Sequence, residues 1–274
     1  MQLVKHHGLG NDFLIAFADD SWGDLAESEL AQLAERICDR RTGVGADGLL
    51  LGFDDPHADV RMVLFNADGG RAEMSGNGIR CFAHAFATRR GDHSRLKVST
   101  DAGLRTVEML PTEDPATWLA TVDMGEVTEI DEPSGWAELG ADPGRPVSHL
   151  SLGNPHAVVP VDDVLAVDLA SLGAKIPHVN LEIIEAGPGP SAITMRVHER
   201  GAGITQACGT GACAAAVAAW RWGLAALADG KLTVHMDGGS ASVGFVANGD
   251  PHAPARVTLT GPTTYVATIE YPHQ

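Results

Sequence analysis

Two glycine-rich turns, each followed by an apolar helical stretch, are the parts of the sequence best suited to chemistry. The first covers residues 75–78, Ser-Gly-Asn-Gly, and the second covers residues 208–211, Cys-Gly-Thr-Gly. A glycine-rich turn that opens a helix presents unpaired backbone N–H groups and the positive end of the helix dipole. Each turn therefore favours an anion: a phosphate, a substrate carboxylate or, at the second turn, the thiolate of Cys208.

Cys208 is the strongest candidate for an acid or base. A thiol at a helix N-terminus is expected to have its pKa lowered from about 8.5 toward neutrality, so that it can both accept and return a proton. The alternative is a small, inert hydrophobic residue, and the nearby Glu199 and Arg200 favour the catalytic interpretation. The other cysteines, Cys38, Cys81 and Cys213, lie in expected helices, where packing is the default role.

Polar side chains near these turns suit a zwitterionic ligand. The Glu199 carboxylate attracts an ammonium group, and the Arg200 guanidinium can bind a carboxylate with two hydrogen bonds, although the two could equally form a surface ion pair. His156 could support a base, although a lone histidine is more often structural. Amide side chains could bind both ends of an amino acid or merely cap local turns; the candidates are Asn11, Asn66, Asn154 and Asn180.

Signatures of the common cofactors and metals are missing from the sequence. It contains no phosphate-binding loop of the Gly-x-x-x-x-Gly-Lys-Ser/Thr type and no convincing dinucleotide-binding turn after a first strand. None of the four lysines has a context that suggests a pyridoxal Schiff base, and no Cys-x-x-Cys pair suggests zinc. We therefore expect chemistry without a cofactor or a metal.

The charge balance points to a small partner. The chain has 274 residues, and 36 Asp and Glu against 19 Lys and Arg give a formal net charge of −17. Such a surface repels nucleic acid and anionic membrane. The N-terminus lacks the apolar core of a secretory signal, and the apolar stretch 207–228 is interrupted by polar residues. With four scattered cysteines, this predicts a soluble cytoplasmic protein with reduced thiols.

The elements that position these residues repeat along the chain. Leu-Gly-Asn at residues 9–11 returns at 152–154, and both glycine-rich turns follow a strand-like run that ends nine residues earlier, at Asn66 and at Glu199. Short alternating runs predict many strands. The sequence therefore predicts an α+β protein of two pseudo-symmetric lobes, each a curved mixed β-sheet, barrel-like, around a central helix.

Three helices are expected from their capping residues. They cover residues 29–40, capped by Ser28, residues 78–90, ended by Gly91, and residues 211–222, ended by Gly223. A segment rich in proline, glycine and aspartate, residues 131–145, is expected to be a surface excursion.

Two segments resemble the signatures of the diaminopimelate epimerase family. The first comprises residues 66–69, Asn-Ala-Asp-Gly, and 73–81, Glu-Met-Ser-Gly-Asn-Gly-Ile-Arg-Cys. The second is residues 199–213, Glu-Arg-Gly-Ala-Gly-Ile-Thr-Gln-Ala-Cys-Gly-Thr-Gly-Ala-Cys. Supporting blocks run in the expected order through nearly the whole chain, at residues 7–13, 41–48, 153–158 and 179–182.

The resemblance implies a cofactor-independent racemase that converts LL-2,6-diaminopimelate to meso-diaminopimelate, a precursor of lysine and the cell wall. In this family two cysteines face opposite sides of the substrate α-carbon, and the enzyme is commonly a homodimer. It implies lobes of residues 1–118 with 263–274 and of residues 119–262, with the site between them. The catalytic positions would be Cys208, Ser75 and His156; the substrate-binding positions would be Asn11, Asn66, Gly76, Asn77, Asn154, Asn180, Glu199, Arg200, Gly209 and Thr210.

Position 75 departs from the family pattern, because Ser75 stands where the family has a cysteine. A hydroxyl is a far poorer acid than a thiol, and losing a positioned acid or base typically costs ~10²–10⁴ in rate. Three explanations stay open: Ser75 or a bound water relays the proton opposite Cys208, the chain performs one-base chemistry, or the serine was introduced in place of a cysteine. An amino-acid-binding module that has lost catalysis is the non-enzymatic alternative.

Overall fold

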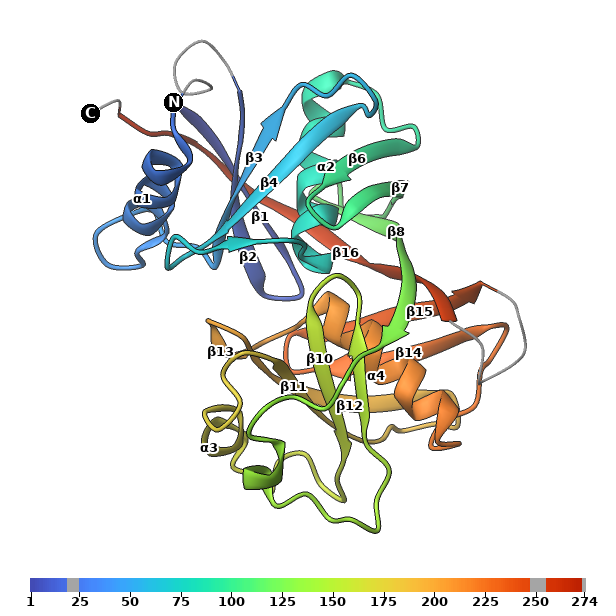
Figure 1. The fold of residues 1–274 in the computed structure, drawn as a ribbon. Coiled ribbons are helices and arrows are strands. Elements are labelled where there is room, and N and C mark those ends of the chain that lie inside the picture. The colour runs from blue at the N-terminus through green and yellow to red at the C-terminus, as the bar shows by residue number, and fades with distance from the viewer. Residues whose placement is uncertain (19–24, 247–254, 273–274) are drawn as a thin grey trace. The chain divides into compact units, whose positions relative to one another are not determined.

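The computed structural model describes residues 1–18, 25–246 and 255–272 (Figure 1). The chain divides into two compact units. Unit 1 comprises Met1–Val122 and Gly261–Gln274, and unit 2 comprises Asp123–Thr260. Two long strands, β8 (Thr117–Glu129) and β16 (Ala255–Glu270), each contribute one part to either unit.

Unit 1 is built on a sheet with the order β16-β1-β2-β3-β4-β6-β7-β8, and the pairing of β8 with β16 closes this order into a ring. The Tyr265 N–H donates to the Ala116 carbonyl at 2.8 Å where the ring closes. The short strand β5 pairs with β4. The strand bounds are β1 Gln2–Gly8, β2 Asn11–Phe17, β3 Gly48–Phe53, β4 Val60–Asn66, β5 Arg71–Ala72, β6 Leu96–Thr100 and β7 Gly103–Pro111.

Helices cover both faces of this sheet. The apolar side of α1 (Glu27–Cys38) packs on strand residues such as Leu49 and Leu51, while α2 (Gly76–Arg90) packs against β1, β2 and β7. The middle strand β3 is therefore buried on both faces and reads as a continuous apolar run, Gly-Leu-Leu-Leu-Gly-Phe, instead of an alternating one.

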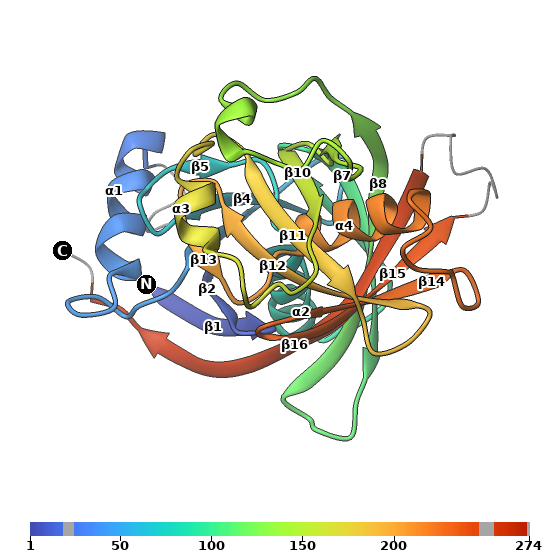
Figure 2. The ribbon, with the colours of Figure 1, turned by 90° about the horizontal axis from the view of Figure 1, so that it is seen from below.

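Unit 2 repeats this plan. Its sheet runs β8-β9-β10-β11-β12-β14-β15-β16, and β13 pairs with β12. The central helix α4 (Gly209–Arg221) lies against β9 to β12 and against β14 and β15 (Figure 2). The other bounds are β9 Ser148–Ser151, β10 Pro155–Pro160, α3 Leu169–Gly173, β11 Asn180–Ala186, β12 Ala192–Glu199, β13 Gly203–Thr205, β14 Lys231–Met236 and β15 Gly239–Val246.

The two units share one sequence of strand pairings, which confirms the predicted internal repeat. In unit 1, β1–β2 is antiparallel, β2–β3 parallel, β3–β4 antiparallel and β4–β6 parallel. In unit 2, β9–β10, β10–β11, β11–β12 and β12–β14 follow the same order of directions. The repeated Leu-Gly-Asn forms the β1–β2 and the β9–β10 turns, where Gly10 and Gly153 have φ angles of 82° and 95°. Such angles favour glycine.

The capping signals located the helix ends better than the helix starts. Gly91 ends α2 in the left-handed conformation, as predicted, and α4 ends just before Gly223. The predicted cap at Ser28 is wrong, because α1 begins at Glu27 with Ala26 as its N-cap residue. There the Glu29 carboxylate accepts the Ala26 N–H at 2.8 Å, so the N-terminus is satisfied by a residue inside the helix.

The segment 131–145 is more than a surface excursion. It contains a 3₁₀ helix, Trp136–Leu139, and the Trp136 side chain is buried. This indole belongs to the same apolar cluster as Leu181 and Ile183 of β11, so the segment is anchored to the core of unit 2. Its proline, glycine and aspartate residues predict an exposed loop, but burial of the one aromatic ring holds the segment against the core.

Two histidines are buried in unit 1 with their rings in edge contact. His6 of β1 and His84 of α2 have ring centroids 4.8 Å apart, and both are almost inaccessible to solvent. Burial is the main cause that lowers the pKa of His6 to about 3 and the pKa of His84 to about 4, with a further contribution from neighbouring histidines. Both rings are therefore neutral in the folded protein near neutral pH.

This pair predicts acid sensitivity. Between pH 6.5 and about 4, His84 is protonated in the unfolded chain but not in the folded chain. The free energy of unfolding therefore falls as the pH drops through this window. In His84→Gln the slope of unfolding free energy against pH should decrease there by about 1.4 kcal/mol per pH unit. Urea unfolding at several pH values measures it. The exposed His57→Gln is the control, and an unchanged slope in His84→Gln would contradict the assignment.

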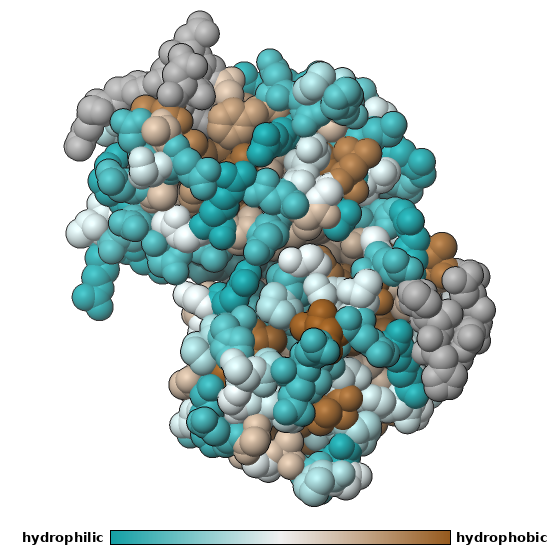
Figure 3. Space-filling model, in the orientation of Figure 1, coloured by the Kyte–Doolittle hydropathy of each residue, from teal (hydrophilic) through white to brown (hydrophobic). Residues whose placement is uncertain are grey.

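The visible face of each unit is mainly polar, with small apolar areas among the polar side chains (Figure 3). Among the described residues, no helix is both long and apolar enough to cross a membrane.

Candidate functional site

Both glycine-rich turns adopt the same local structure. Ser75 and Cys208 are the N-cap residues of α2 and α4, with φ and ψ angles of −134° and 124° for Ser75 and of −122° and 116° for Cys208. The Ser75 hydroxyl accepts the Gly78 N–H at 3.0 Å, and the Cys208 sulfur accepts the Gly211 N–H at 3.4 Å. The side chains of positions 75 and 208 thus cap the N-termini of two equivalent helices.

The environment of Cys208 corrects one expectation. Burial, followed by the nearby Glu199 and Glu182 carboxylates, raises the pKa of the Cys208 thiol well above its ordinary value. The hydrogen bonds from Gly211 and Thr210 act in the opposite direction and are weaker. The prediction of a lowered thiol pKa from the helix N-terminus is therefore wrong for this environment, because burial and the two carboxylates outweigh the hydrogen bonds from Thr210 and Gly211.

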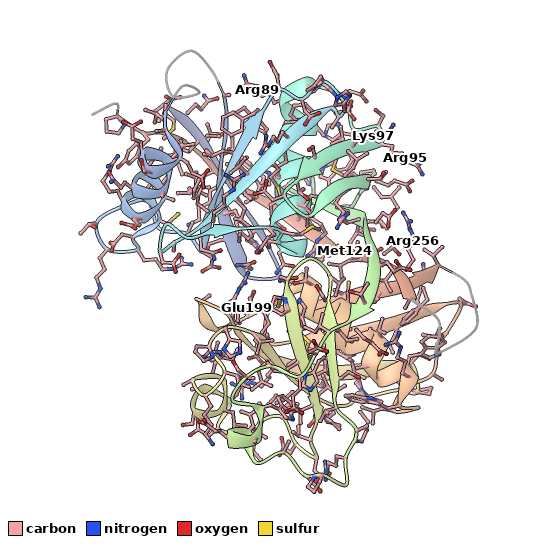
Figure 4. The ribbon with its side chains drawn as sticks, viewed as in Figure 1. Arg89, Arg95, Lys97, Met124, Glu199 and Arg256 are labelled. Carbon is pink, nitrogen blue, oxygen red and sulfur yellow. The ribbon has the colours of Figure 1, made fainter. Side chains whose placement is uncertain are left out.

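Glu199 is the last residue of β12 (Figure 4), and its carboxylate accepts a hydrogen bond from the Cys208 thiol. Burial raises the pKa of Glu199, and hydrogen bonds with Thr205 and with the Cys208 thiol partly offset the rise. Because burial raises the pKa of both groups, this environment disfavours two negative charges on the pair. The arrangement instead suits one proton exchanged between a thiol and a carboxylate.

A chain of side chains leads from Cys208 to His156. The Cys208 sulfur lies 3.5 Å from Thr210 Oγ1, which accepts a hydrogen bond from Asn154 Nδ2 at 3.2 Å. Asn154 Oδ1 lies 3.0 Å from His156 Nε2, and His156 Nδ1 lies 2.7 Å from Glu182 Oε1. The predicted positions Asn154, His156, Thr210 and Cys208 are thus brought together in unit 2.

The Asn180 side chain binds the backbone of Arg200. Asn180, the first residue of β11, accepts the Arg200 N–H at 2.9 Å and donates to the Pro155 carbonyl at 2.9 Å. The buried amide therefore joins the end of β12 to the start of β10 and holds the Glu199–Arg200 segment in place.

A second cluster surrounds the first turn in unit 1. Asn11 donates to Asp47 Oδ2 at 2.8 Å and accepts from Asn77 at 3.2 Å. The fully buried Arg80 donates to Asn77 Oδ1 at 2.7 Å and to the Gly76 carbonyl at 2.9 Å. Asn11, Gly76 and Asn77 are thus brought together beside Ser75, on a scaffold that is held by a buried guanidinium.

Asn66 closes β4 at a tight turn, where its N–H donates to the Gly70 carbonyl at 2.8 Å. Its position matches that of Glu199 in the repeat, because each is the last residue of a strand that ends nine residues before the helix N-cap, Ser75 or Cys208. The first turn therefore has a neutral amide where the second has a carboxylate.

Comparison with known proteins shows to which family the chain belongs. The model of the family described as diaminopimelate epimerase matches residues 3–130 and 149–266. A diaminopimelate epimerase of Desulfitobacterium hafniense is 39% identical over 285 residues, covering 97% of this chain and 96% of that protein. The chain belongs to the diaminopimelate epimerase family. A second family member, from Heliobacterium modesticaldum, is 37% identical over 99% of this chain.

A solved structure shows the same fold outside the family's close relatives. A phenazine biosynthesis protein of the PhzF family from Bacillus anthracis superposes with a TM-score of 0.73 over 100% of this chain and 99% of that protein, at 16% identity. This likeness confirms the predicted α+β architecture of curved mixed sheets, each with a central helix.

Three residues of the two clusters were not among the predicted site residues of this epimerase-family chain. Glu182 holds His156, Asp47 holds Asn11, and Arg80 holds Asn77. Glu182, Asp47 and Arg80 each lie inside a block that resembles the family, but no local pattern assigns them a partner. Within residues 1–18, 25–246 and 255–272, no group of three or more His, Cys, Asp or Glu is arranged to hold a metal ion.

Gly211 is the tightest point of the second cluster. A Cβ atom there would lie 2.5 Å from Glu182 Oε1 and 3.2 Å from the Cys208 sulfur. We expect Gly211→Ala to displace both groups and to lower kcat by about 10²-fold, the typical cost of misplacing a reacting group by about 1 Å. Steady-state kinetics measures the effect. Gly189→Ala, where a Cβ meets no atom within 4 Å, is the control; equal activity of the two variants would contradict the argument.

Proposed function

We propose that this chain interconverts LL- and meso-2,6-diaminopimelate without a cofactor, with Cys208 as an acid and base at the substrate α-carbon. Membership of the diaminopimelate epimerase family supports the reaction. The observation that carries the proposal is the placement of Cys208: a buried thiol at a helix N-terminus that shares hydrogen bonds with Glu199, Thr210 and the Gly211 N–H.

The proton transfers follow from this placement. The Cys208 thiol first passes its proton to the Glu199 carboxylate, whose raised pKa makes it a suitable acceptor. The resulting thiolate takes the α-proton, and the C–H electron pair remains on the α-carbon, delocalised into the substrate carboxylate. Return of a proton to the opposite face completes epimerisation, and return to the same face restores the substrate.

Backbone donors supply the charge stabilisation in this proposal. The first N–H groups of a helix have no acceptor within the helix. We assign those of Gly209 and Thr210, and those of Gly76 and Asn77, to the α-carboxylate, where negative charge grows as the α-proton leaves. Glu199 and Arg200, with the four asparagines Asn11, Asn66, Asn154 and Asn180, complete the proposed substrate contacts, and His156 supports the reacting centre.

Ser75 favours a second candidate function, one-base chemistry. Its hydroxyl caps α2 just as the Cys208 sulfur caps α4, but it does not form a stable anion near neutral pH. Unless Ser75 or a water relays a proton, the second face of the α-carbon lacks an efficient acid. The chain would then exchange the α-proton of one stereoisomer without inverting it.

Incubation of each stereoisomer in heavy water separates these functions. A two-base enzyme exchanges the α-proton and interconverts the isomers. A one-base enzyme exchanges the proton of one isomer with retention, and a binding module gives neither result. Proton NMR of the α-position and chiral chromatography of the products read out exchange and inversion independently.

We further propose a cytoplasmic homodimer. Tyr265 and Val266 on β16 are 40% and 49% exposed, and they are apolar residues that a second copy could cover. Sedimentation velocity of the wild type and of Val266→Lys tests this, because a charge at a dimer contact should shift the protein toward the monomer. A monomeric wild type would contradict the proposal.

A further inference from the structure

Glu182 is a completely buried carboxylate beside the proposed acid and base. It lies on β11, whose parallel pairing with β10 places it opposite Val158, two residues after His156. Both the Glu182 and the His156 side chains have no solvent exposure. A carboxylate in such a place is costly unless a partner compensates it, and His156 Nδ1 at 2.7 Å from Oε1 is that partner.

The hydrogen bonds beyond His156 have a fixed direction. Asn154 uses its Nδ2 group to donate to Thr210, so its Oδ1 atom faces His156 Nε2 and can only accept. His156 Nε2 must therefore carry a hydrogen, and one further proton lies between Nδ1 and Glu182.

The same direction continues to the sulfur. Thr210 Oγ1 accepts from Asn154, which leaves the hydroxyl hydrogen of Thr210 available to donate to the Cys208 sulfur at 3.5 Å. With the Gly211 N–H at 3.4 Å, the sulfur then has two donors, an arrangement that favours the thiolate once it forms.

We propose that Glu182 is a positioning residue that fixes the His156 ring through Nδ1 and so sets the direction of the hydrogen-bond chain that ends at the Cys208 sulfur. The expected change in kcat rests on the proposed function, whereas the fixed orientation of the His156 ring does not. Three ionisable groups face this carboxylate within the cluster: His156, Cys208 and Glu199.

Glu182 positions His156 through a hydrogen bond, so a substitution that keeps this bond and one that removes it should differ in kcat. Glu182→Gln keeps an oxygen and an N–H group that can bond Nδ1, whereas Glu182→Met keeps a similar length and bonds nothing. Mutating a residue that orients a metal-bound histidine typically lowers metal affinity or activity by about 10- to 100-fold. We expect a comparable loss of kcat in Glu182→Met, with KM little changed. Glu182→Gln should retain most of the wild-type kcat.

A spectroscopic readout tests the positioning itself. In the full-length protein with ¹⁵N-labelled histidine, the His156 Nε2–H resonance should be visible and slow to exchange in the wild type and in Glu182→Gln. In Glu182→Met it should be lost to exchange with water, because the ring is no longer held. Glu185→Met, which removes a carboxylate from the same strand at a bond to the Val164 N–H, is the control and should leave the resonance intact.

Each outcome has a definite meaning. Retention of the resonance or of full kcat in Glu182→Met would overturn the proposal, as would an equal loss of kcat in Glu182→Gln. Absence of epimerase activity from the wild type, with the resonance behaving as expected, would overturn the proposed function and leave the positioning role standing.

Discussion

Replacement of Cys208 by alanine is expected to abolish exchange of the substrate α-proton with solvent deuterium, or to slow it by at least ~10²-fold. The thiol caps the N-terminus of α4, and Glu199 and Thr210 are arranged around its sulfur. Alanine removes the proton acceptor and leaves the Glu199 carboxylate without its thiol partner. Proton NMR of each stereoisomer in heavy water, with enzyme at high concentration, measures the effect.

A matched control lies on the same helix. Cys213 is also completely buried, but it is five residues further along α4, which places it about 140° around the helix axis from Cys208. Cys213→Ala should lower thermal stability while keeping exchange near the wild-type rate, since a packing thiol is lost. If Cys208→Ala exchanged the α-proton as fast as Cys213→Ala, Cys208 would not be the base.

The helix ends and the repeat could be predicted because their signals are local. A left-handed glycine such as Gly91 needs no distant partner to end a helix. The repeated Leu-Gly-Asn likewise marks two turns, because its glycine adopts a positive φ angle in both. By contrast, the strand Asn11–Phe17 has no alternating pattern, because helices cover both faces of its sheet and every residue but the last is buried.

The electrostatics of the site could not be predicted, because they depend on residues distant in sequence. The glycine-rich turn at Cys208 indicates a lowered thiol pKa only if the helix dipole acts alone. In the folded chain Glu182, 26 positions earlier, lies close enough to raise it, and burial adds the larger effect. Asp47 is likewise distant from its partner Asn11, by 36 positions. Arg80 lies only three positions from Asn77, but its burial and its bond to Asn77 appear only with the fold.

The second large effect is expected from Ser75→Cys, which should raise the rate of epimerisation at least ~10-fold. Position 75 has the backbone geometry and the Gly78 N–H donor that a capping thiol needs, in the same form as at Cys208. Burial and then the Glu199 and Glu182 carboxylates raise the pKa of Cys208. Asn66 is the repeat equivalent of Glu199, so a thiol at position 75 would lack the Glu199 contribution. The introduced thiol would therefore form its thiolate more readily than Cys208 does, which gives one base and one acid.

Ser75→Ala separates the chemistry of position 75 from its capping role. It removes the hydroxyl bond to the Gly78 N–H and should destabilise α2 by about 1 kcal/mol, without any gain in epimerisation. Inversion is followed by chiral chromatography and exchange by NMR, for all three residues at position 75. If the cysteine variant, folded and as stable as the wild type, inverted the substrate no faster than the serine protein, position 75 would be adapted to one-base chemistry, because a competent acid at that position would then have no effect.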